Sequence, residues 1–219
     1  VSELGYEALA ITPDPGCLDP WNLGPNELAD VLHWSRDLGI DLVVETGSRF
    51  LLDAERKHFP SLLEAGASDR ERRLDFLKRC VEIADAIDAP VVSIWSGSLH
   101  GATSTALALD STLTNVLWDR LVRGVRELTT FAEDFAVRIA FEPEPGMFVE
   151  DLLGYQELLR RMGAAPPNFG LTLDLGHCLV NGEDVVESIH AFSDQLINVH
   201  LDDIANREHT HRMFGEGEL

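Results

Sequence analysis

The chain is poor in lysine and in positive charge generally. Only Lys57 and Lys78 are lysines, and 17 basic residues stand against 38 acidic ones, which gives a net charge of −21 over 219 residues. Nucleic-acid binding depends on Lys and Arg side chains that neutralise phosphates, so we expect no nucleic-acid partner. The acidic excess predicts a well-solvated surface. It still leaves room for a small anionic substrate wherever arginines gather locally.

Long apolar runs, signal patterns and paired cysteines are also missing. No run of about 18 apolar residues occurs, so we expect no membrane span, and no secretory leader pattern follows Val1. Cys17, Cys80 and Cys178 lie far apart and form no CxxC pair, which indicates reduced thiols in a cytoplasmic protein. No GxGxxG follows the first strand-like segment, which removes the main support for a doubly wound nucleotide-binding sheet.

What the chain does contain is a regular alternation of strand-like and helix-like segments. Short apolar runs predict strands at Tyr6–Ile11, Asp41–Glu45, Pro90–Trp95, Val137–Glu142, Phe169–Asp174 and Leu196–Leu201. Amphipathic patterns predict helices at Asn26–Leu38, Asp69–Ile87, Leu113–Phe135, Val149–Met162 and Glu183–Ala191. Such alternation is typical of a parallel α/β fold.

The number of strands bears on the fold class. A closed (β/α)8 TIM barrel has eight strands, and the sequence predicts six. We therefore expect residues 1–219 to form a single TIM barrel domain without its first and last strands, with one strand before Val1 and one after Leu219. An open doubly wound sheet is the alternative.

Acids and histidines stand at the ends of the last three predicted strands. Glu142 follows VRIAF, Asp174 and His177 end FGLTLDLGH, and His200 ends LINVH. The carboxyl ends of barrel strands meet at one face, so these four side chains should converge. Carboxylates and imidazoles are ligands for a divalent metal. The alternative interpretations are that the acids are exposed loop residues and that His177 is an ordinary core histidine.

Further residues near the strand ends are candidates for binding a substrate. These are Glu144, Trp95, Arg49, Lys57, His209, His211 and Arg212. The arginines suit a phosphate, a carboxylate or sugar hydroxyls, and the two histidines, two residues apart, could face one side of an extended loop. Surface charge and core packing are the alternative interpretations for the basic residues and for Trp95.

The segments FEPEPG, LDLGH, NVHLDD and HRMFGEGEL resemble the xylose isomerase-like barrels, which include sugar isomerases, ketose 3-epimerases and class II AP endonucleases. The likeness extends from about Leu38 to the end. It implies a metal (Mn, Mg, Co or Zn) held by Glu142, Asp174, His200 and a glutamate on the final strand, which has no match here. It also implies that His177 contacts the substrate, or a second metal as in the endonucleases.

The resemblance favours an isomerase or epimerase of a small sugar, polyol or sugar phosphate. In such chemistry a metal stabilises an enediolate while carboxylates exchange a proton, and Glu142 and His177 are the predicted catalytic residues. A hydrolase similar to the AP endonucleases, or a lyase such as a dehydratase, is the alternative. Glu45-Thr46 and Trp95 replace two strand-end histidines of the endonucleases, so a full trinuclear zinc site is not expected. A non-catalytic sugar-binding module and a homo-oligomer stay open.

Overall fold

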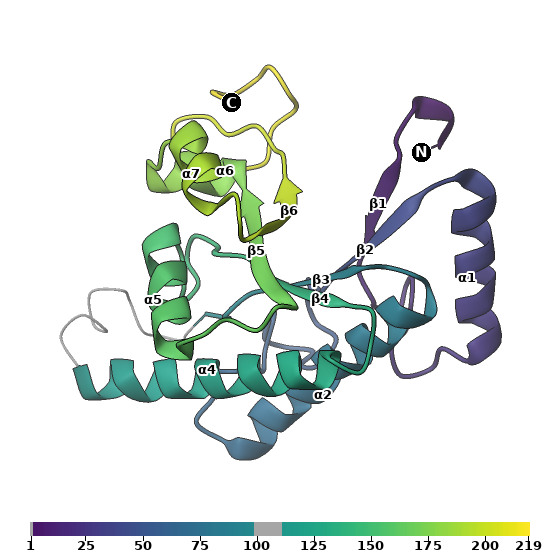
Figure 1. Ribbon diagram of the computed structural model, residues 1–219, viewed down its shortest axis with the longest axis horizontal. Helices are drawn as coiled ribbons and strands as arrows, with labels where there is room; N and C mark the ends of the chain where they lie inside the picture. Colours follow the sequence, from purple (N-terminus) through teal and green to yellow (C-terminus); the bar gives the residue numbers. More distant parts are fainter. Residues whose placement is uncertain (1, 99–110) are drawn as a thin grey trace. The chain divides into compact units, whose positions relative to one another are not determined.

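The computed structural model describes residues 2–98 and 111–219, and its strands follow the chain in sheet order (Figure 1). The order is β1-β2-β3-β4-β5-β6. The strands are β1 (Ala8–Ile11), β2 (Asp41–Glu45), β3 (Val91–Ile94), β4 (Arg138–Phe141), β5 (Phe169–Asp174) and β6 (Leu196–His200). A doubly wound sheet reverses its strand order at a switch point, whereas a barrel does not. The predicted barrel type, with six of eight strands, is confirmed.

The helices agree with the sequence prediction in number and place, with two exceptions. They are η1 (Ser2–Leu4, a 3-10 turn), α1 (Pro25–Leu38), α2 (Ala67–Ala86), α4 (Ser111–Ala132), α5 (Leu152–Met162), α6 (Leu175–Asn181) and α7 (Val185–Phe192). The short helix α6 was not predicted, because seven residues directly after a strand leave little amphipathic repeat to detect. The 3-10 turn η1 lies within Val1–Gly5, which the sequence indicates is the end of a helix, and it differs from that expectation in being a 3-10 turn of three residues.

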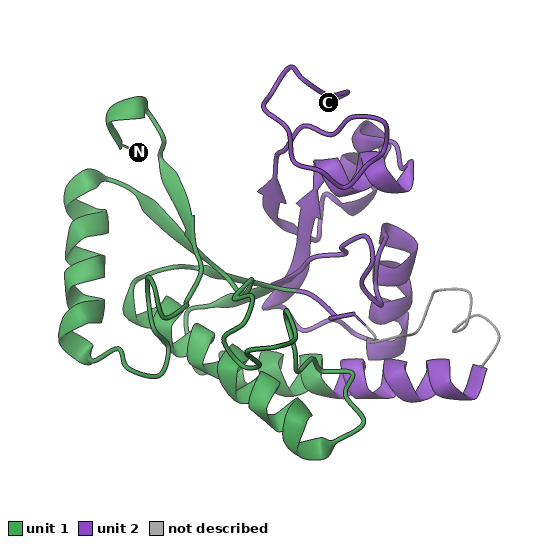
Figure 2. Ribbon diagram, turned by 180° about the vertical axis from the view of Figure 1, so that it is seen from behind, with its two compact units in different colours: residues 1–94, 124–139 green, residues 95–123, 140–219 purple. Residues whose placement is uncertain are grey.

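The described chain divides into two compact units (Figure 2). Unit 1 contains residues 1–94 and 124–139, and unit 2 contains residues 95–123 and 140–219. In unit 1, β1 and β2 pair in parallel with Ala8 opposite Asp41, and β2 pairs in parallel with β3. Phe76 and Ile83 of α2 are fully buried there. Gly124 of α4 lies so near Leu62 that a Cβ would come within 2.9 Å of its Cδ2, so these segments pack closely.

Unit 2 has a core of aromatic rings beside its parallel strand pair, β5 and β6. Tyr155 of α5 is fully buried, and its ring centroid lies 6.2 Å from that of Phe141, 6.3 Å from Phe169 and 5.9 Å from Phe192. Offset and edge-on ring pairs at these separations stabilise a core beyond the area that they bury. The core therefore holds the last residue of β4, which directly precedes Glu142, and the first residue of β5.

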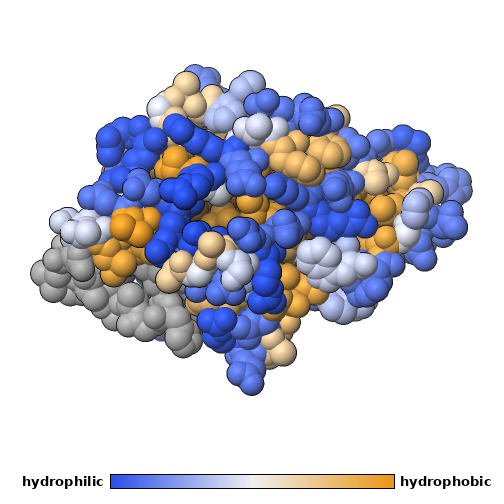
Figure 3. Space-filling view, turned by 90° about the horizontal axis from the view of Figure 1, so that it is seen from below, coloured by the Kyte–Doolittle hydropathy of each residue, from blue (hydrophilic) through white to orange (hydrophobic). Residues whose placement is uncertain are grey.

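The surface reflects the composition. The face shown in Figure 3 is mainly hydrophilic, with hydrophobic residues in scattered places. Among the described residues, none of the helices has both the length and the apolar character to cross a membrane.

Candidate metal centre

The site starts from Asp174, the last residue of a strand that is buried throughout. Its side chain is 6% exposed, and a charge in that position is costly unless it has partners. One carboxylate oxygen, Oδ1, accepts the backbone N–H of His177 at 2.9 Å and so caps helix α6. The other, Oδ2, lies 3.7 Å from Nδ1 of His200. One side chain thus both starts a helix and faces the site.

A β-bulge brings His200 opposite Asp174. In the β5–β6 pair Leu171 lies opposite Leu196, but Thr172 lies opposite Asn198, so Ile197 is the extra residue. Since side chains alternate between the faces of a strand, a one-residue shift reverses which of them point to a given side. With the shift, Asp174 pairs with His200. The bulge therefore decides which β6 side chains meet the carboxylate.

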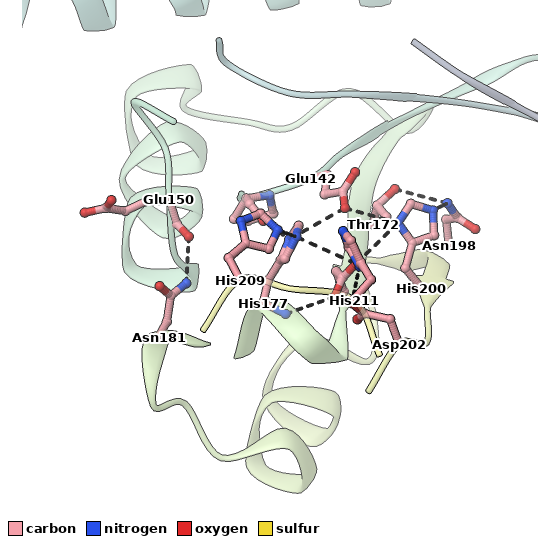
Figure 4. Close-up of polar contacts among 12 residues, drawn as sticks. Glu142, Glu150, Thr172, His177, Asn181, Asn198, His200, Asp202, His209 and His211 are labelled. Atoms are coloured by element: carbon pink, nitrogen blue, oxygen red, sulfur yellow. Dashed lines mark hydrogen bonds and ion pairs between the residues drawn. The ribbon is translucent and has the colours of Figure 1, made fainter. Parts of the chain in front are cut away.

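Glu142, the first residue after β4, contributes the second carboxylate. It is 7% exposed, and its Oε1 lies 3.1 Å from Nδ1 of His200 and 3.7 Å from Nδ1 of His177. Glu142, Asp174 and His177 each offer a ligand atom within 4.8 Å of the others. Figure 4 shows the side chains of Glu142 and His177 near each other. Carboxylate and imidazole donors that are converged and buried fit a divalent cation.

The electrostatics of these groups support that fit. Burial raises the pKa of Asp174 above its ordinary value of 3.8, and the negative charges of Asp202 and Glu142 raise it further. The N–H of His177 partly offsets this, because a hydrogen bond to the ionised form lowers the pKa. A cation would relieve the repulsion among these carboxylates, which makes the donor set suitable for a metal rather than for an anion.

His177 is held in a defined orientation by two contacts. Its Nδ1 lies 3.0 Å from the carbonyl oxygen of Pro143, which can only accept, so Nδ1 carries the proton. Its Nε2 lies 3.1 Å from Nε2 of His209, and the two rings meet edge to face. Burial, and then the nearby His209, lower the pKa of His177 to about 4. The imidazole is therefore neutral near pH 7, which suits a ligand or a hydrogen-bonding group.

His211 extends this row of histidines on the same loop. Its ring centroid is 5.5 Å from that of His209, and its Nδ1 is hydrogen-bonded to Oδ2 of Asp202 (Figure 4). Asp202 reaches this position because Gly176 has no side chain: a Cβ there would overlap Oδ1 of Asp202. Gly176 lies within α6. It makes room for Asp202 there.

The remaining candidates from the sequence lie apart from this cluster or have no demonstrated role. Glu144 lies in the turn after β4, where its N–H donates a hydrogen bond to the carbonyl oxygen of Val149. Trp95 is 7% exposed and belongs largely to the core. Arg212 is exposed, on the loop that carries His211.

Arg49 belongs to unit 1. It lines a hollow of about 590 Å³ beyond the ends of β1 and β2, together with Thr12, Asp14, Pro15, Gly47, Phe50 and Leu51. Within residues 2–98 and 111–219, no hydrogen bond or ion pair to the Arg49 guanidinium is found. A cationic group with that much open space beside it can bind an anionic ligand.

Two supporting residues were not recognised from the sequence. The side-chain amide of Asn198 lies 3.2 Å from Nε2 of His200 and 3.4 Å from Oγ1 of Thr172, so it fixes the His200 ring. Asp202 fixes His211 in the same way. Asn198 precedes His200 by two residues in a strand, which places both on one face, and this spacing was the available signal.

The cysteines do not take part in this chemistry. Cys17, Cys80 and Cys178 are free thiols, and the last two are buried. Burial raises the pKa of Cys178, which follows His177 on α6, to about 12. A thiolate is the nucleophilic form, so Cys178 is a poor nucleophile at neutral pH.

The chain is similar in sequence to known proteins. Over 222 aligned residues the chain is 24% identical to fructoselysine 3-epimerase of Shigella flexneri, with 100% of this chain and 74% of that protein covered. Over 93 residues, 42% of this chain and 29% of the relative, it is 31% identical to inosose dehydratase of Geobacillus kaustophilus.

Solved structures share the fold. A D-tagatose 3-epimerase-like protein matches 100% of this chain and 76% of its own, with a TM-score of 0.79 and 18% identity. D-allulose 3-epimerase from Methylomonas sp. in complex with D-allulose matches 99% of this chain and 67% of its own, with a TM-score of 0.74 and 16% identity. The family model described as xylose isomerase-like TIM barrel matches residues 1–219. The chain therefore belongs to the xylose isomerase-like TIM barrel family.

Proposed function

We propose that this protein is a divalent-metal-dependent isomerase or epimerase of a small sugar, polyol or sugar phosphate. The observation that carries the proposal is the convergence of Glu142, Asp174 and His200 from three strand ends within unit 2. In barrels of this type the strand ends form the active site. The similarity to fructoselysine 3-epimerase, which covers all of this chain and 74% of that protein, supports an epimerase.

We assign the metal to Glu142, Asp174 and His200. Nδ1 of His200 faces both carboxylates, at 3.1 Å from Glu142 and 3.7 Å from Asp174. By contrast, Nδ1 of His177 is hydrogen-bonded to the carbonyl of Pro143, and its Nε2 faces His209. His177 is therefore better placed to contact the substrate than to be a ligand. Mn, Mg, Co and Zn all suit a site of this composition.

The chain's own residues supply positioning and proton transfer. When bound, the metal provides a Lewis acid that stabilises negative charge on the substrate's oxygens. The Glu142 carboxylate removes the proton from the carbon beside the sugar carbonyl. Neutral His177 accepts a hydrogen bond at its Nε2, because Pro143 fixes the proton on Nδ1. The returning proton is assigned to the glutamate that the family carries on its last strand.

Further contacts to the substrate are proposed for the other candidate residues from the sequence. His209, His211 and Arg212 share one loop, and the side chains of the first two lie in a row with His177. Arg49 would contact an anionic substituent, and Lys57 is a second cation in the same segment of unit 1. Glu144 and Trp95 remain candidates on the turn after β4 and at the end of β3.

The test is proton exchange at carbon. Ketoses, their phosphates and amino-acid-linked ketoses are incubated with the protein in D2O and Mn²⁺, Mg²⁺ or Co²⁺, and deuterium incorporation is followed by NMR. Glu142→Gln should abolish exchange, since an amide cannot take up the proton. Glu187→Gln on α7 is the matched control and should retain activity. Undiminished exchange in Glu142→Gln would show the assignment to be wrong.

A hydrolase or lyase is the second candidate function. The row of three imidazoles, with His177 and His209 joined at 3.1 Å and His211 next to His209, favours a second metal and hence a hydrolase. The similarity to inosose dehydratases over part of the chain favours a lyase. Elemental analysis distinguishes a hydrolase from an epimerase, because one metal per chain supports the epimerase and two or more support the hydrolase. Product analysis identifies water elimination by a lyase.

A further inference from the structure

Asp203 accepts four backbone hydrogen bonds on a single carboxylate. Its Oδ2 accepts the N–H groups of Gly215 at 2.7 Å and Gly217 at 2.9 Å. Its Oδ1 accepts those of Leu219 at 3.0 Å and Ile204 at 3.1 Å. The residue is 1% exposed. Charge-assisted hydrogen bonds of this kind are about twice as strong as neutral ones, so this carboxylate is a strong anchor for the chain around it.

The backbone around Asp203 holds the same loop from its other side. The carbonyl oxygen of Asp203 accepts the N–H of Arg212 at 2.9 Å, and the carbonyl of Ile204 accepts that of Glu218 at 2.8 Å. The loop at 205–219 is therefore hydrogen-bonded at two points, Arg212 and Glu218, to the consecutive residues Asp203 and Ile204. Most side chains from 206 to 216 are exposed, so apolar packing contributes little to the loop's position.

The loop sequence matches this anchor. A Cβ at Gly217 would overlap Oδ1 of Asp203 and the carbonyl oxygen of Ile204, so glycine is required for the close approach. Gly215 has a φ of +90°, which other residues adopt only with strain. The Gly-Glu-Gly segment therefore has glycine at Gly215 for the left-handed turn and at Gly217 for the close approach to Asp203.

The loop's opposite end meets the candidate metal centre. His209 contacts His177 through their Nε2 atoms, and His211 contacts Asp202. Among the described residues, the Asp203 carboxylate contacts backbone N–H groups of its own segment and of this loop, and none of its hydrogen bonds reaches Glu142 or Asp174. Its influence on the centre therefore acts through the loop.

We propose that Asp203 is a positioning residue that holds the loop at 205–219 so that His209 and His211 face the metal centre. The expected loss of activity rests on the proposed function, but the expected displacement of the loop does not. With the carboxylate neutralised, the loop loses its anchor while β5, β6 and the ligands on them keep their places. The histidine contacts are then lost although the metal site remains.

The first test uses Asp203→Asn, which keeps the shape but removes the charge and replaces one acceptor by a donor. Histidine ring signals are recorded by ¹H–¹³C NMR in the protein with and without Mg²⁺. The signals of His209, His211 and His177 should shift or broaden, while those of His33 and His190, which lie elsewhere, stay in place. Asp184→Asn, which removes a single carboxylate cap at the start of α7, is the matched control and should leave all five unchanged.

Gly217→Ala tests the same anchor without changing the carboxylate. It should reproduce the histidine shifts of Asp203→Asn, and it carries the test if that variant does not fold. For both variants Mn²⁺ affinity should stay within about twofold of the parent, while kcat/KM falls by about 100-fold, the usual effect of a ~1 Å displacement. Histidine spectra that superimpose on the parent's would overturn the proposal. If the parent shows no exchange with any sugar, the proposed function fails, whereas the spectra still decide the role of Asp203.

Discussion

Nδ1 of His200 lies 3.1 Å from Oε1 of Glu142, although 58 residues separate the two along the chain. The intervening segment contains a complete strand, β5, whose last residue is Asp174. Each of the three side chains stands at or directly beyond the carboxyl end of its strand, which is where a barrel gathers its functional residues. Their meeting point is the basis of the predictions that follow.

Asn198 should tune the metal site through His200. Asn198→Leu keeps the approximate volume but removes the amide that lies 3.2 Å from Nε2 of His200. Loss of such a supporting hydrogen bond lowers metal affinity by about 10–100-fold. Isothermal titration with Mn²⁺ measures the effect. Asn181→Leu, which loses a hydrogen bond to the carbonyl of Glu150 instead, should bind Mn²⁺ like the parent. Equal losses in both variants would mean that the effect is general.

In the metal-free protein, the contribution of Asp174 to stability should fall as the pH rises. Because the pKa of Asp174 is raised above 3.8 in the folded chain, the folded state retains a proton that the unfolded state has released. This group's contribution is therefore greatest below pH 3.8 and is lost as the pH rises through the folded pKa. Urea unfolding of the parent and of Asp174→Asn across pH 4–8 gives the difference. Saturating Mn²⁺ should remove it, and identical pH profiles without metal would contradict the prediction.

Gly176 and Asp202 should be energetically coupled. In Gly176→Ala the new methyl would overlap Oδ1 of Asp202 and crowd Ile204, so Asp202 must release His211. Overpacking of this kind costs about 1–3 kcal/mol, which exceeds the ~1 kcal/mol that alanine gains over glycine in a helix. In the Asp202→Ala background, Gly176→Ala should lower the free energy of unfolding by less, because the carboxylate that the new methyl would overlap is absent. A double-mutant cycle measured by urea unfolding should give a coupling of about 0.5–3 kcal/mol, and strict additivity would refute it.

Arg49 should discriminate between charged and neutral substrates. Arg49→Gln removes the cation from its hollow, and a hydrogen bond to a charged group contributes about 1.5 kcal/mol or more, so KM for an anionic sugar should rise about tenfold. KM for its neutral counterpart should change little. Arg36→Gln, which breaks an exposed ion pair with Asp88, is the control. A similar rise for both sugars would assign Arg49 a structural role.

Much of the fold followed from the sequence because its signals are local. Apolar runs such as Phe169–Asp174, buried at every residue, are typical of parallel strands, and this strand was predicted with its exact limits. The C-terminal end of α1 at Leu38 was also predicted, and Gly39 ends the helix with a left-handed φ of +61°. Glu142, Asp174 and His200 were placed together on the argument that barrel strand ends meet.

The contacts among side chains were less predictable, because they depend on register and close approach. The bulge at Ile197, which sets Asp174 opposite His200, leaves no trace in hydropathy. Gly176 makes room for Asp202 within helix α6, and this close approach cannot be predicted from the sequence. The four hydrogen bonds to Asp203 come from residues up to 16 positions away, and no sequence motif predicts them.

Anomalous diffraction from a crystal grown with Mn²⁺ locates the bound metal. We expect one strong manganese peak within about 2.0–2.2 Å of a Glu142 oxygen, Oδ2 of Asp174 and Nδ1 of His200, the usual range for such ligands. Its intensity should vanish in a crystal of the Asp174→Asn, His200→Gln double variant. A peak bonded instead to His177, His209 and His211, with Glu142 and Asp174 left unbound, would contradict the proposed centre.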